Sequence, residues 1–468
     1  MASTADLPYK MHVTPDNTGL WHIKQTEEAA KKVSELLEQD METHHVFFNL
    51  EGFHNHIPHH LLALYGTGAP PSALQSAYAT NATYQRPLFP PHTRDHLNFH
   101  PWPQAAKPYF GREEYYPDFL RFFQSEIKAQ GGSWQRVMGK YLLGLEWGEE
   151  GKEGTKRAEL GSGGEEEMLV RLFAGLLHPL IQLMYGVEWH QEAIVAEALA
   201  QTAVHQGDIG GYLLEAERVA RESGNGDGGK KVGIMELLEE IRGNEKLASA
   251  ARNEDANKIR DGVLARAKEE MISVAARVRV RPEEVEERTA EMFNSAVFVA
   301  AAASLVKEGE KENKFDFFLM HHVTSSPFFV SINAQDWIPA EAKARLLEWK
   351  IRMDLLDFAA RGVPELSVAK LEAYKPRKPD AGGSLSEIIS RLHTFPDDGH
   401  AIKLGRAAVI CHNICKKYED EGKDWLRVKG EDMWKKVCHL IVDSVEAPGA
   451  HWVRSCGFDE AWKDIPNI

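Results

Sequence analysis

The spacing of apolar residues is the feature that most limits the folds open to this chain. Apolar side chains recur every three or four residues in most segments, for example in 26–39, 168–185 and 337–360, which is typical of helices packed against a core. Strand-like alternation is nearly absent, apart from short runs such as 328–332. The pattern predicts an all-α protein, a single large helical domain over residues 1–468 with long irregular loops.

Charge and cysteine usage exclude several classes of function. The 468 residues carry a net charge of −15, which argues against nucleic acid or an anionic membrane as the main partner. The four cysteines (Cys411, Cys415, Cys438 and Cys456) all lie near the C-terminal end of the sequence, so no disulfide framework spans it. The first residues lack the apolar core of a secretory signal, and no apolar run reaches the length of a membrane span. We expect a cytosolic protein.

A histidine-rich stretch, residues 52–65, is the first candidate for a site. His54, His56, His59 and His60 fall within seven residues, and an apolar helix start follows at once. Neutral imidazole is the commonest side-chain ligand for a borderline transition metal. His56 and His60 are four residues apart and would share one face of a helix. The same histidines would equally serve to cap and pack the start of that helix, so these residues alone leave both interpretations open.

His178 is a single histidine inside the apolar segment 168–185. Pro179 follows it, lacks an amide hydrogen and so frees the carbonyl of Gly175. A histidine at such a kink has room to point inward, and the alternative is a core histidine bonded to the freed carbonyl. Three further histidines fall in the proline-rich segment 70–108, which we expect to be an irregular loop where a spacing of four has little meaning: His92, His96 and His100.

A pair of adjacent histidines, His321 and His322, lies in the apolar segment 315–325. At helical spacing they fall beneath Phe317 and Phe318. At least one of the two must therefore face the core, and the sequence does not decide which.

The segment that begins at Asp397 combines a helix cap with two buried polar residues. Asp397 or Asp398 is a natural N-cap for a helix that starts at His400. His400 and Lys403 lie on a stripe of this helix that continues as apolar residues, which directs both toward the core. Burial lowers the pKa of a lysine, and a neutral amine is the form that reacts with carbon dioxide to give a carbamate, an oxygen ligand. The alternative is that Lys403 extends to solvent.

Four segments together resemble the questin oxidase-like family of fungi: HNHIPHHLLALYGTGAP, GLLHPLIQLMYG, FDFFLMHHVTSS and PDDGHAIKLGRA. They spread over residues 49–415, so the resemblance covers most of the chain. The family contains enzymes of aromatic polyketide pathways that open the central ring of anthraquinones and are described as Baeyer–Villiger-type oxidases. A member similar to this chain is a non-haem iron dioxygenase with four histidines and a carboxylated lysine around the metal.

Carried over to this sequence, the resemblance implies a set of metal ligands. His60 or His56 would come from the first motif, where His59 also competes, and His321 or His322 would come from the third. The residues we predict at the metal are therefore His56, His60, His178, His321, His400 and Lys403, with Lys403 carboxylated and the residue to which we assign a catalytic role. Shared coordination requires His178 and His400 to lie within about 6 Å of each other, because metal–nitrogen bonds are near 2 Å.

The function that the resemblance implies is an iron(II)-dependent oxygenase of secondary-metabolite biosynthesis. It would use dioxygen to cleave a carbon–carbon bond of an anthraquinone-type aromatic polyketide. One alternative is an NADPH-dependent Baeyer–Villiger-type monooxygenase on the same substrates, although no glycine-rich turn follows a strand in this sequence. A zinc hydrolase that uses a carbamylated lysine is a second alternative, and a helical binding protein with structural histidines is a third.

Overall fold

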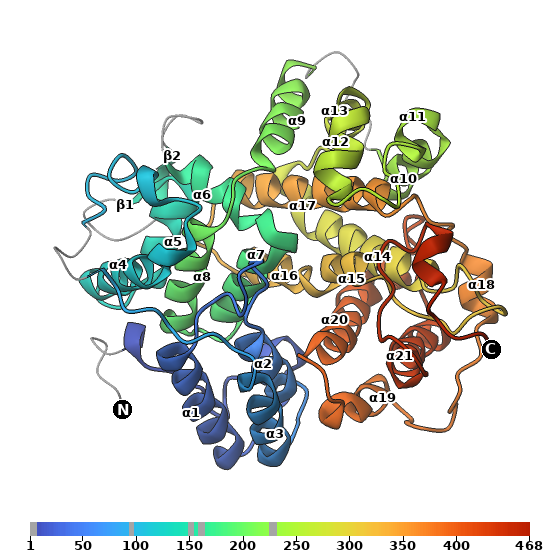
Figure 1. Ribbon diagram of the computed structural model, residues 1–468, viewed down its shortest axis with the longest axis horizontal. Helices are drawn as coiled ribbons and strands as arrows, with labels where there is room; N and C mark the ends of the chain where they lie inside the picture. The colour runs from blue at the N-terminus through green and yellow to red at the C-terminus, as the bar shows by residue number, and fades with distance from the viewer. Residues whose placement is uncertain (1–6, 93–97, 148–153, 158–163, 224–231) are drawn as a thin grey trace. The chain divides into compact units, whose positions relative to one another are not determined.

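The computed structural model describes residues 7–92, 98–147, 154–157, 164–223 and 232–468. Helices dominate these ranges, so the all-α prediction is confirmed (Figure 1). Two short strands, β1 (Leu145–Trp147) and β2 (Gly154–Arg157), pair antiparallel. The run 328–332, which alternates like a strand in the sequence, lies in helix α16 (Pro327–Asn333).

The chain forms two compact units. The first contains residues 1–210, 330–342 and 393–403, and the second contains 211–329, 343–392 and 404–468. Helices α9 (Gly210–Glu222), α16, α17 (Ala340–Ala360) and α20 (His400–Asp420) have residues in both units. The interpretation of residues 1–468 as a single domain stays a prediction.

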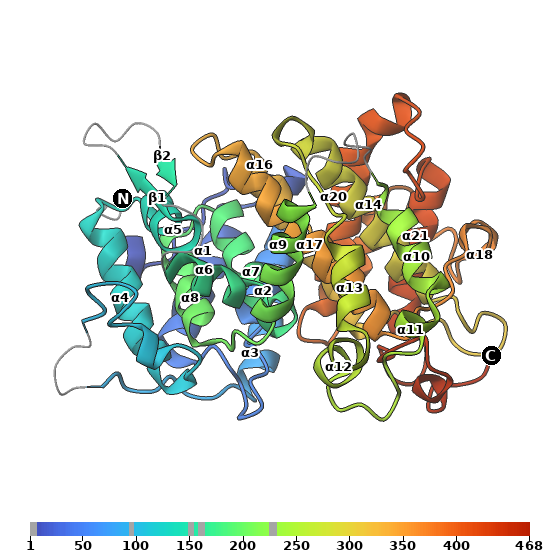
Figure 2. The same ribbon diagram turned by 90° about the horizontal axis from the view of Figure 1, so that it is seen from above.

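The first unit is built around α8 (Glu192–Val204). All residues of α8 after Glu192 are buried, and α8 packs against both α4 and α7 (Figures 1 and 2). Its many alanines allow neighbouring helices to approach closely on more than one side. The other helices of this unit are α1 (Glu27–Thr43), α2 (Ile57–Gly66), α3 (Pro71–Ala82), α4 (Tyr116–Ala129), α5 (Trp134–Leu143), α6 (Gly164–Leu172) and α7 (Ala174–Glu188).

The second unit has the long buried helix α14 (Val285–Ala303) against α15 (Phe317–Thr324). Helix α19 (Leu385–Ser390) packs on α21 (Glu431–Glu446). This unit also contains α9 after its first residue, and α10 (Ile234–Gly243), α11 (Glu245–Ala248), α12 (Leu264–Arg266), α13 (Lys268–Ala275) and α18 (Val368–Ala373).

Helix starts follow the local sequence. Thr26 caps α1 by accepting a hydrogen bond from the backbone N–H of Ala29, and Ser133 caps α5 in the same way. The expectation that 70–108 is a loop throughout is wrong, because α3 occupies its first part. Pro71 stands in the first turn of α3, where its missing N–H costs nothing, and an alanine-rich segment follows.

The expected single helix over 168–185 is wrong as well, because two helices replace it. Helices α6 and α7 meet at an angle of 96°. The backbone of Gly175, Leu176 and Leu177 has positive φ angles of 52°, 54° and 64°. Pro179 explains the break, since its ring would clash with the carbonyl of Gly175 in a continuous helix.

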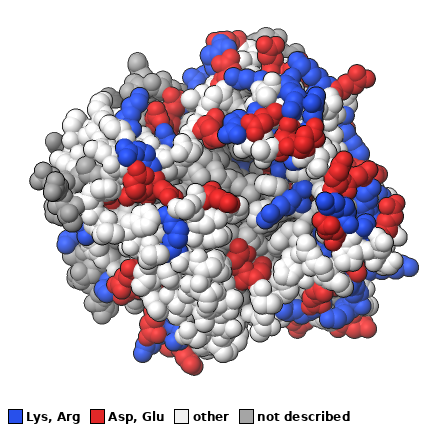
Figure 3. Space-filling view, in the orientation of Figure 1, with Lys and Arg blue, Asp and Glu red and all other residues white. Residues whose placement is uncertain are grey.

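The surface carries charged side chains of both signs. On the face shown in Figure 3, acidic and basic side chains are intermingled. Among the helices in the described ranges, no single helix is both long enough and apolar enough to cross a membrane. Helices α6 and α7 meet both criteria only when taken together, and they form a pair bent by 96°.

Gly175→Ala tests the role of the bend. A Cβ at this position would lie 2.2 Å from Nε2 of His205, and the φ angle of 52° is unfavourable for alanine. We expect the free energy of unfolding to fall by at least about 1–2 kcal/mol, measured by chemical denaturation. Gly211→Ala is the control, because a Cβ there meets nothing within 4 Å and the residue is helical. Equal stability of both variants would contradict this account of the bend.

Candidate metal centre

Three histidines from distant parts of the sequence meet in the first unit. His56, His178 and His400 are all buried, and one ring nitrogen of each lies within 4.8 Å of the others. His56 is the residue before α2, His178 lies in α7, and His400 begins α20. The separation is inside the limit of about 6 Å set above for His178 and His400, and the three rings form a group that could hold one ion.

The bend in α7 fixes the orientation of His178. Its Nδ1 lies 2.7 Å from the carbonyl oxygen of Gly175, the carbonyl that Pro179 leaves without an intrahelical partner. Because a carbonyl only accepts, the ring proton is on Nδ1 and the lone pair of the neutral ring is on Nε2. His178 therefore bonds the freed carbonyl and also points its other nitrogen inward.

His56 and His400 share one carboxylate. Asp398 Oδ2 lies 2.9 Å from Nδ1 of His56, and Oδ1 of the same residue accepts from Nδ1 of His400. Burial alone would raise the pKa of Asp398, but its interactions with His400 and His56 hold that pKa well below its usual range. Burial, with a smaller contribution from Lys403, lowers the pKa of His56 to about 3, so this ring is neutral near pH 7.

These hydrogen bonds decide whether the three rings can hold a metal. Nε2 of His56 and Nε2 of His178 lie 2.9 Å apart. With both rings neutral and protonated on Nδ1, no proton lies between the two Nε2 atoms, and their lone pairs face each other. A cation that accepts both lone pairs removes this repulsion. With the Nδ1 proton of His400 also engaged by Asp398, the donor set fits a borderline transition metal.

Lys403 follows His400 by one helical turn and is buried, with 2% of its surface exposed. The alternative in which it extends to solvent is therefore wrong. Its Nζ has no hydrogen-bond partner among the described residues. Burial lowers the pKa of Lys403 to about 8, against the opposing charges of Asp398 and Asp397. Its charge also contributes to the lowered pKa values of His56, His59 and His60, which places it near all three.

The remaining histidines of the first motif have other neighbours. His60 lies outside the group of three and packs under Gly399, where a Cβ on the glycine would be 2.6 Å from Cβ of His60. Nε2 of His59 lies 2.6 Å from Oε1 of Gln182. His54 stacks on His178, with ring centroids 4.0 Å apart. His56 is thus the member of this motif in the cluster, and a ligand role for His60 stays a prediction.

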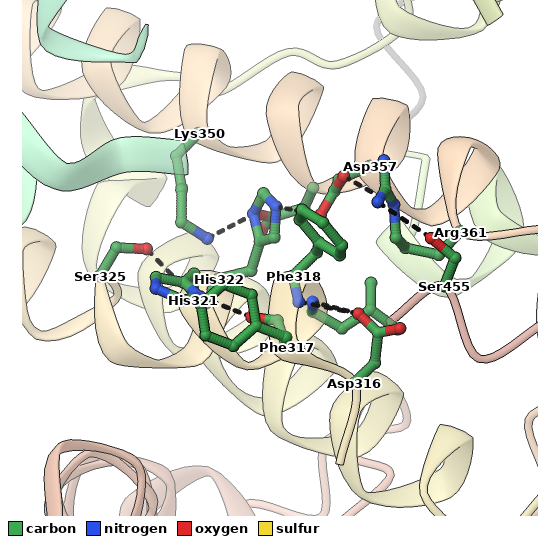
Figure 4. Close-up of polar contacts among 12 residues, drawn as sticks. Asp316, Phe317, Phe318, His321, His322, Ser325, Lys350, Asp357, Arg361 and Ser455 are labelled. Atoms are coloured by element: carbon green, nitrogen blue, oxygen red, sulfur yellow. Dashed lines mark hydrogen bonds and ion pairs between the residues drawn. The ribbon is translucent and has the colours of Figure 1, made fainter. Parts of the chain in front are cut away.

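The two histidines of the third motif lie in the second unit and differ in chemistry (Figure 4). His322 contacts Asp354 through Nδ1 and Asp357 through Nε2, the latter at 3.0 Å. Although burial opposes it, these carboxylates raise the pKa of His322. An imidazolium that donates from both nitrogens has no lone pair for a metal.

The hydrogen bond of His321 allows it to act as a ligand in its neutral form. Its Nδ1 donates to the backbone carbonyl of Phe317, so in the neutral ring the lone pair is on Nε2. Of the adjacent pair, His321 is the residue able to coordinate. It belongs to the second unit and lies outside the group of three, so its ligand role stays a prediction.

His322 is part of a buried chain of charges. Lys350 donates to Asp354, and Nε of Arg361 lies 3.2 Å from Asp357. Figure 4 shows His322 of α15 and Lys350 and Asp357 of α17 pointing toward one another, with Arg361 directly after α17. Alternating signs along the chain compensate each charge locally, which a buried ionic group requires.

Other possible ligands have structural partners. His92 contacts Asp118 and His100 contacts Glu126, while His96 lies outside the described residues. Cys411 and Cys415 are buried and free, with sulfur atoms 3.9 Å apart.

Two features of the site were not predicted from the sequence. The first is the pairing of His54 with His205, whose Nε2 atoms are 2.7 Å apart. The second is the contact of Asp398 with two histidines. The signal for it was present in the position of Asp398 beside His400, but only a capping role was considered for it.

Comparisons with known proteins agree with the resemblance. The family model described as "Questin oxidase-like" matches residues 53–408. The chain is 34% identical to Baeyer-Villiger oxidase ptaJ of Pestalotiopsis fici, over 93% of this chain and 92% of the relative. It is 36% identical to Baeyer-Villiger monooxygenase dmxR6 of Cryptosporiopsis sp., over 97% and 98%, and 34% identical to questin oxidase of Aspergillus fumigatus, over 86% and 87%. The chain is therefore an oxidoreductase and belongs to the questin oxidase-like family.

Proposed function

We propose that this protein is an iron(II)-dependent oxygenase that opens a ring of an anthraquinone-type aromatic polyketide by cleaving a carbon–carbon bond. The observation that carries the proposal is the convergence of His56, His178 and His400, each with Nδ1 held by an acceptor. The substrate class rests on the relatives, which are named questin oxidase and Baeyer–Villiger oxidases. These names support ring opening of aromatic polyketides in secondary-metabolite biosynthesis, with dioxygen as the second substrate.

The predicted ligands suit iron(II) both in charge and in the type of donor atom. His56, His178 and His400 would supply neutral nitrogen ligands, with His60 and His321 as the further predicted ligands. Iron(II), when bound, would supply the redox chemistry that activates dioxygen. The protein's own contribution is to hold each ring in one tautomer and to keep water away from a buried site.

Lys403 would add the negative charge that three imidazoles lack. The lone pair of its neutral amine attacks the carbon of carbon dioxide, a carbon–nitrogen bond forms, one carbon–oxygen π bond becomes an oxyanion, and the nitrogen releases a proton to water. The carbamate then plays the part of the carboxylate in a facial triad. Its burial and its lack of a hydrogen-bond partner among the described residues support this role.

A Baeyer–Villiger-type monooxygenase on the same substrates is the second candidate, because several relatives carry that name. It would consume one NADPH for each dioxygen, whereas the dioxygenase consumes none. A zinc hydrolase with a carbamylated lysine usually carries an added aspartate ligand. Asp397 and Asp398 have oxygens within 4.8 Å of a ring nitrogen of His400, but each also accepts two hydrogen bonds within the protein, so this candidate is less well supported. Parallel measurement of oxygen and NADPH consumption, with an anthraquinone such as questin, separates the three.

Metal content tests the centre directly. We expect wild-type protein purified with iron(II) under anaerobic conditions to hold close to one iron per chain. His178→Ala and His400→Ala should lose most of it, because each removes a nitrogen donor. The measurement is elemental analysis, with circular dichroism to confirm folding.

The control for these variants is His12→Ala, which replaces an exposed histidine outside the cluster and should retain iron. Full iron content in both His178→Ala and His400→Ala would contradict the proposal.

Lys403→Ala tests the carbamate. Turnover should fall by at least tenfold, and acetate or propionate should restore part of it by filling the vacated space with a carboxylate. Lys416→Ala, an exposed change on the same helix, should leave turnover unchanged. Wild-type protein in ¹³C-bicarbonate should show a carbamate carbon in its NMR spectrum. Unchanged turnover in Lys403→Ala would rule this role out.

Adjacent substitutions test the assignment of the third motif. His321→Ala should lower iron content. His322→Ala should retain iron but lower the free energy of unfolding by about 3–5 kcal/mol, because it leaves buried carboxylates without their partner. Iron content is measured on the folded fraction, and stability by chemical denaturation. The reverse pattern would assign the ligand role to His322.

A further inference from the structure

We propose that Asp398 is the positioning residue of the metal centre and that it fixes the tautomers of two ligands at once. Its two oxygens accept hydrogen bonds from Nδ1 of His56 and Nδ1 of His400. The inference rests on the proposed function, since it concerns residues that would hold the metal. No step of the reaction is assigned to Asp398.

The chemistry of a carboxylate makes this role specific. An ionised carboxylate has acceptors only, so both histidines must present an N–H to it. Each neutral ring then carries its lone pair on Nε2, the nitrogen left for the metal. A single side chain thus sets the donor atoms of two ligands that lie 344 residues apart in the sequence, 56 and 400. Outer carboxylates of this kind typically contribute 10- to 100-fold to metal affinity.

Asp397 and Asp398 are adjacent but accept hydrogen bonds from different groups. Asp397 accepts from the backbone N–H groups of Gly399 and Ala401, both at 2.8 Å, and so caps the first turn of α20. Asp398 makes neither contact and bonds the histidine rings instead. Asp397 is therefore a natural control for a change at Asp398.

Gly399 explains how neighbouring carboxylates reach different targets. Its φ angle is 91°, a conformation that favours glycine, and the chain turns there just before α20 begins. A Cβ at Gly399 would lie 2.6 Å from Cβ of His60 in α2. The turn therefore lies directly against the helix that follows His56, which places Asp398 within reach of both rings.

The test compares Asp398→Asn with Asp397→Asn. An asparagine at 398 has one acceptor and one donor group, so it can serve the Nδ1–H of only one histidine. Apo protein is titrated with Co(II), whose d–d absorption reports the number and type of its ligands. We expect Asp398→Asn to bind Co(II) about 10- to 100-fold more weakly with an altered spectrum. Asp397→Asn should be less stable but keep the wild-type affinity and spectrum.

A second measurement needs no variant and remains decisive if Asp398→Asn fails to fold. Two-bond ¹H–¹⁵N correlation spectra of apo wild-type protein labelled with ¹⁵N-histidine distinguish the two neutral tautomers. We expect the Nδ1–H form for both His56 and His400. The Nε2–H form in either ring would overturn the proposal.

The possible outcomes distinguish the role of Asp398 from the proposed function on which it rests. Wild-type affinity and spectrum in Asp398→Asn would overturn the role of Asp398 and leave the metal centre standing. Failure of wild-type protein to bind Co(II) or iron(II) would overturn both. A loss of affinity equal in Asp397→Asn and Asp398→Asn would also overturn the proposal, because it would mean that the effect comes from the helix start.

Discussion

The candidate metal centre in the first unit depends on the hydrogen bonds that the Nδ1 protons of three histidines make. His178 gives its Nδ1 proton to the carbonyl of Gly175, while His56 and His400 give theirs to Asp398. These bonds leave the Nε2 atoms of His56 and His178 facing each other at 2.9 Å, and a ring nitrogen of His400 lies within 4.8 Å of them. Neutral imidazoles so oriented repel one another through their lone pairs, and this repulsion is the physical reason that the cluster suits a cation.

The bend between α6 and α7 is what allows the first of these bonds. Pro179 prevents a continuous helix, and the left-handed backbone at 175–177 lets the carbonyl of Gly175 meet the ring of His178. A straight helix with an amide N–H at position 179 would use that carbonyl internally. The proline is therefore part of the site, although its own side chain carries no polar group.

The two units use buried histidine in opposite ways. In the first unit, burial lowers the pKa of His56 to about 3 and leaves a neutral donor. In the second, Asp354 and Asp357 outweigh burial and keep His322 charged between them. The same side chain is thus a neutral nitrogen base or a buried cation, according to whether a carboxylate faces one of its ring nitrogens or both. The motifs that carry both kinds of histidine lie within residues 53–408, which the family model matches.

The sequence by itself determined the all-α class, the cap at Ser133 and the position of His400 on the core-facing stripe of its helix, whereas for Lys403 it left burial and extension to solvent open. Each follows from local spacing or local hydrogen bonding, which act within one or two helical turns. It did not determine α3, the bend after α6, or which histidine of the first motif joins the cluster. His56 lies before α2 rather than on its face, so the four-residue spacing to His60 did not apply. The choice among these histidines, and the separate tasks of Asp397 and Asp398, were decided only by tertiary structure. The reason is that the hydrogen bond between His56 and Asp398 joins residues 342 positions apart in the sequence, and the sequence neighbours of neither residue specify that contact.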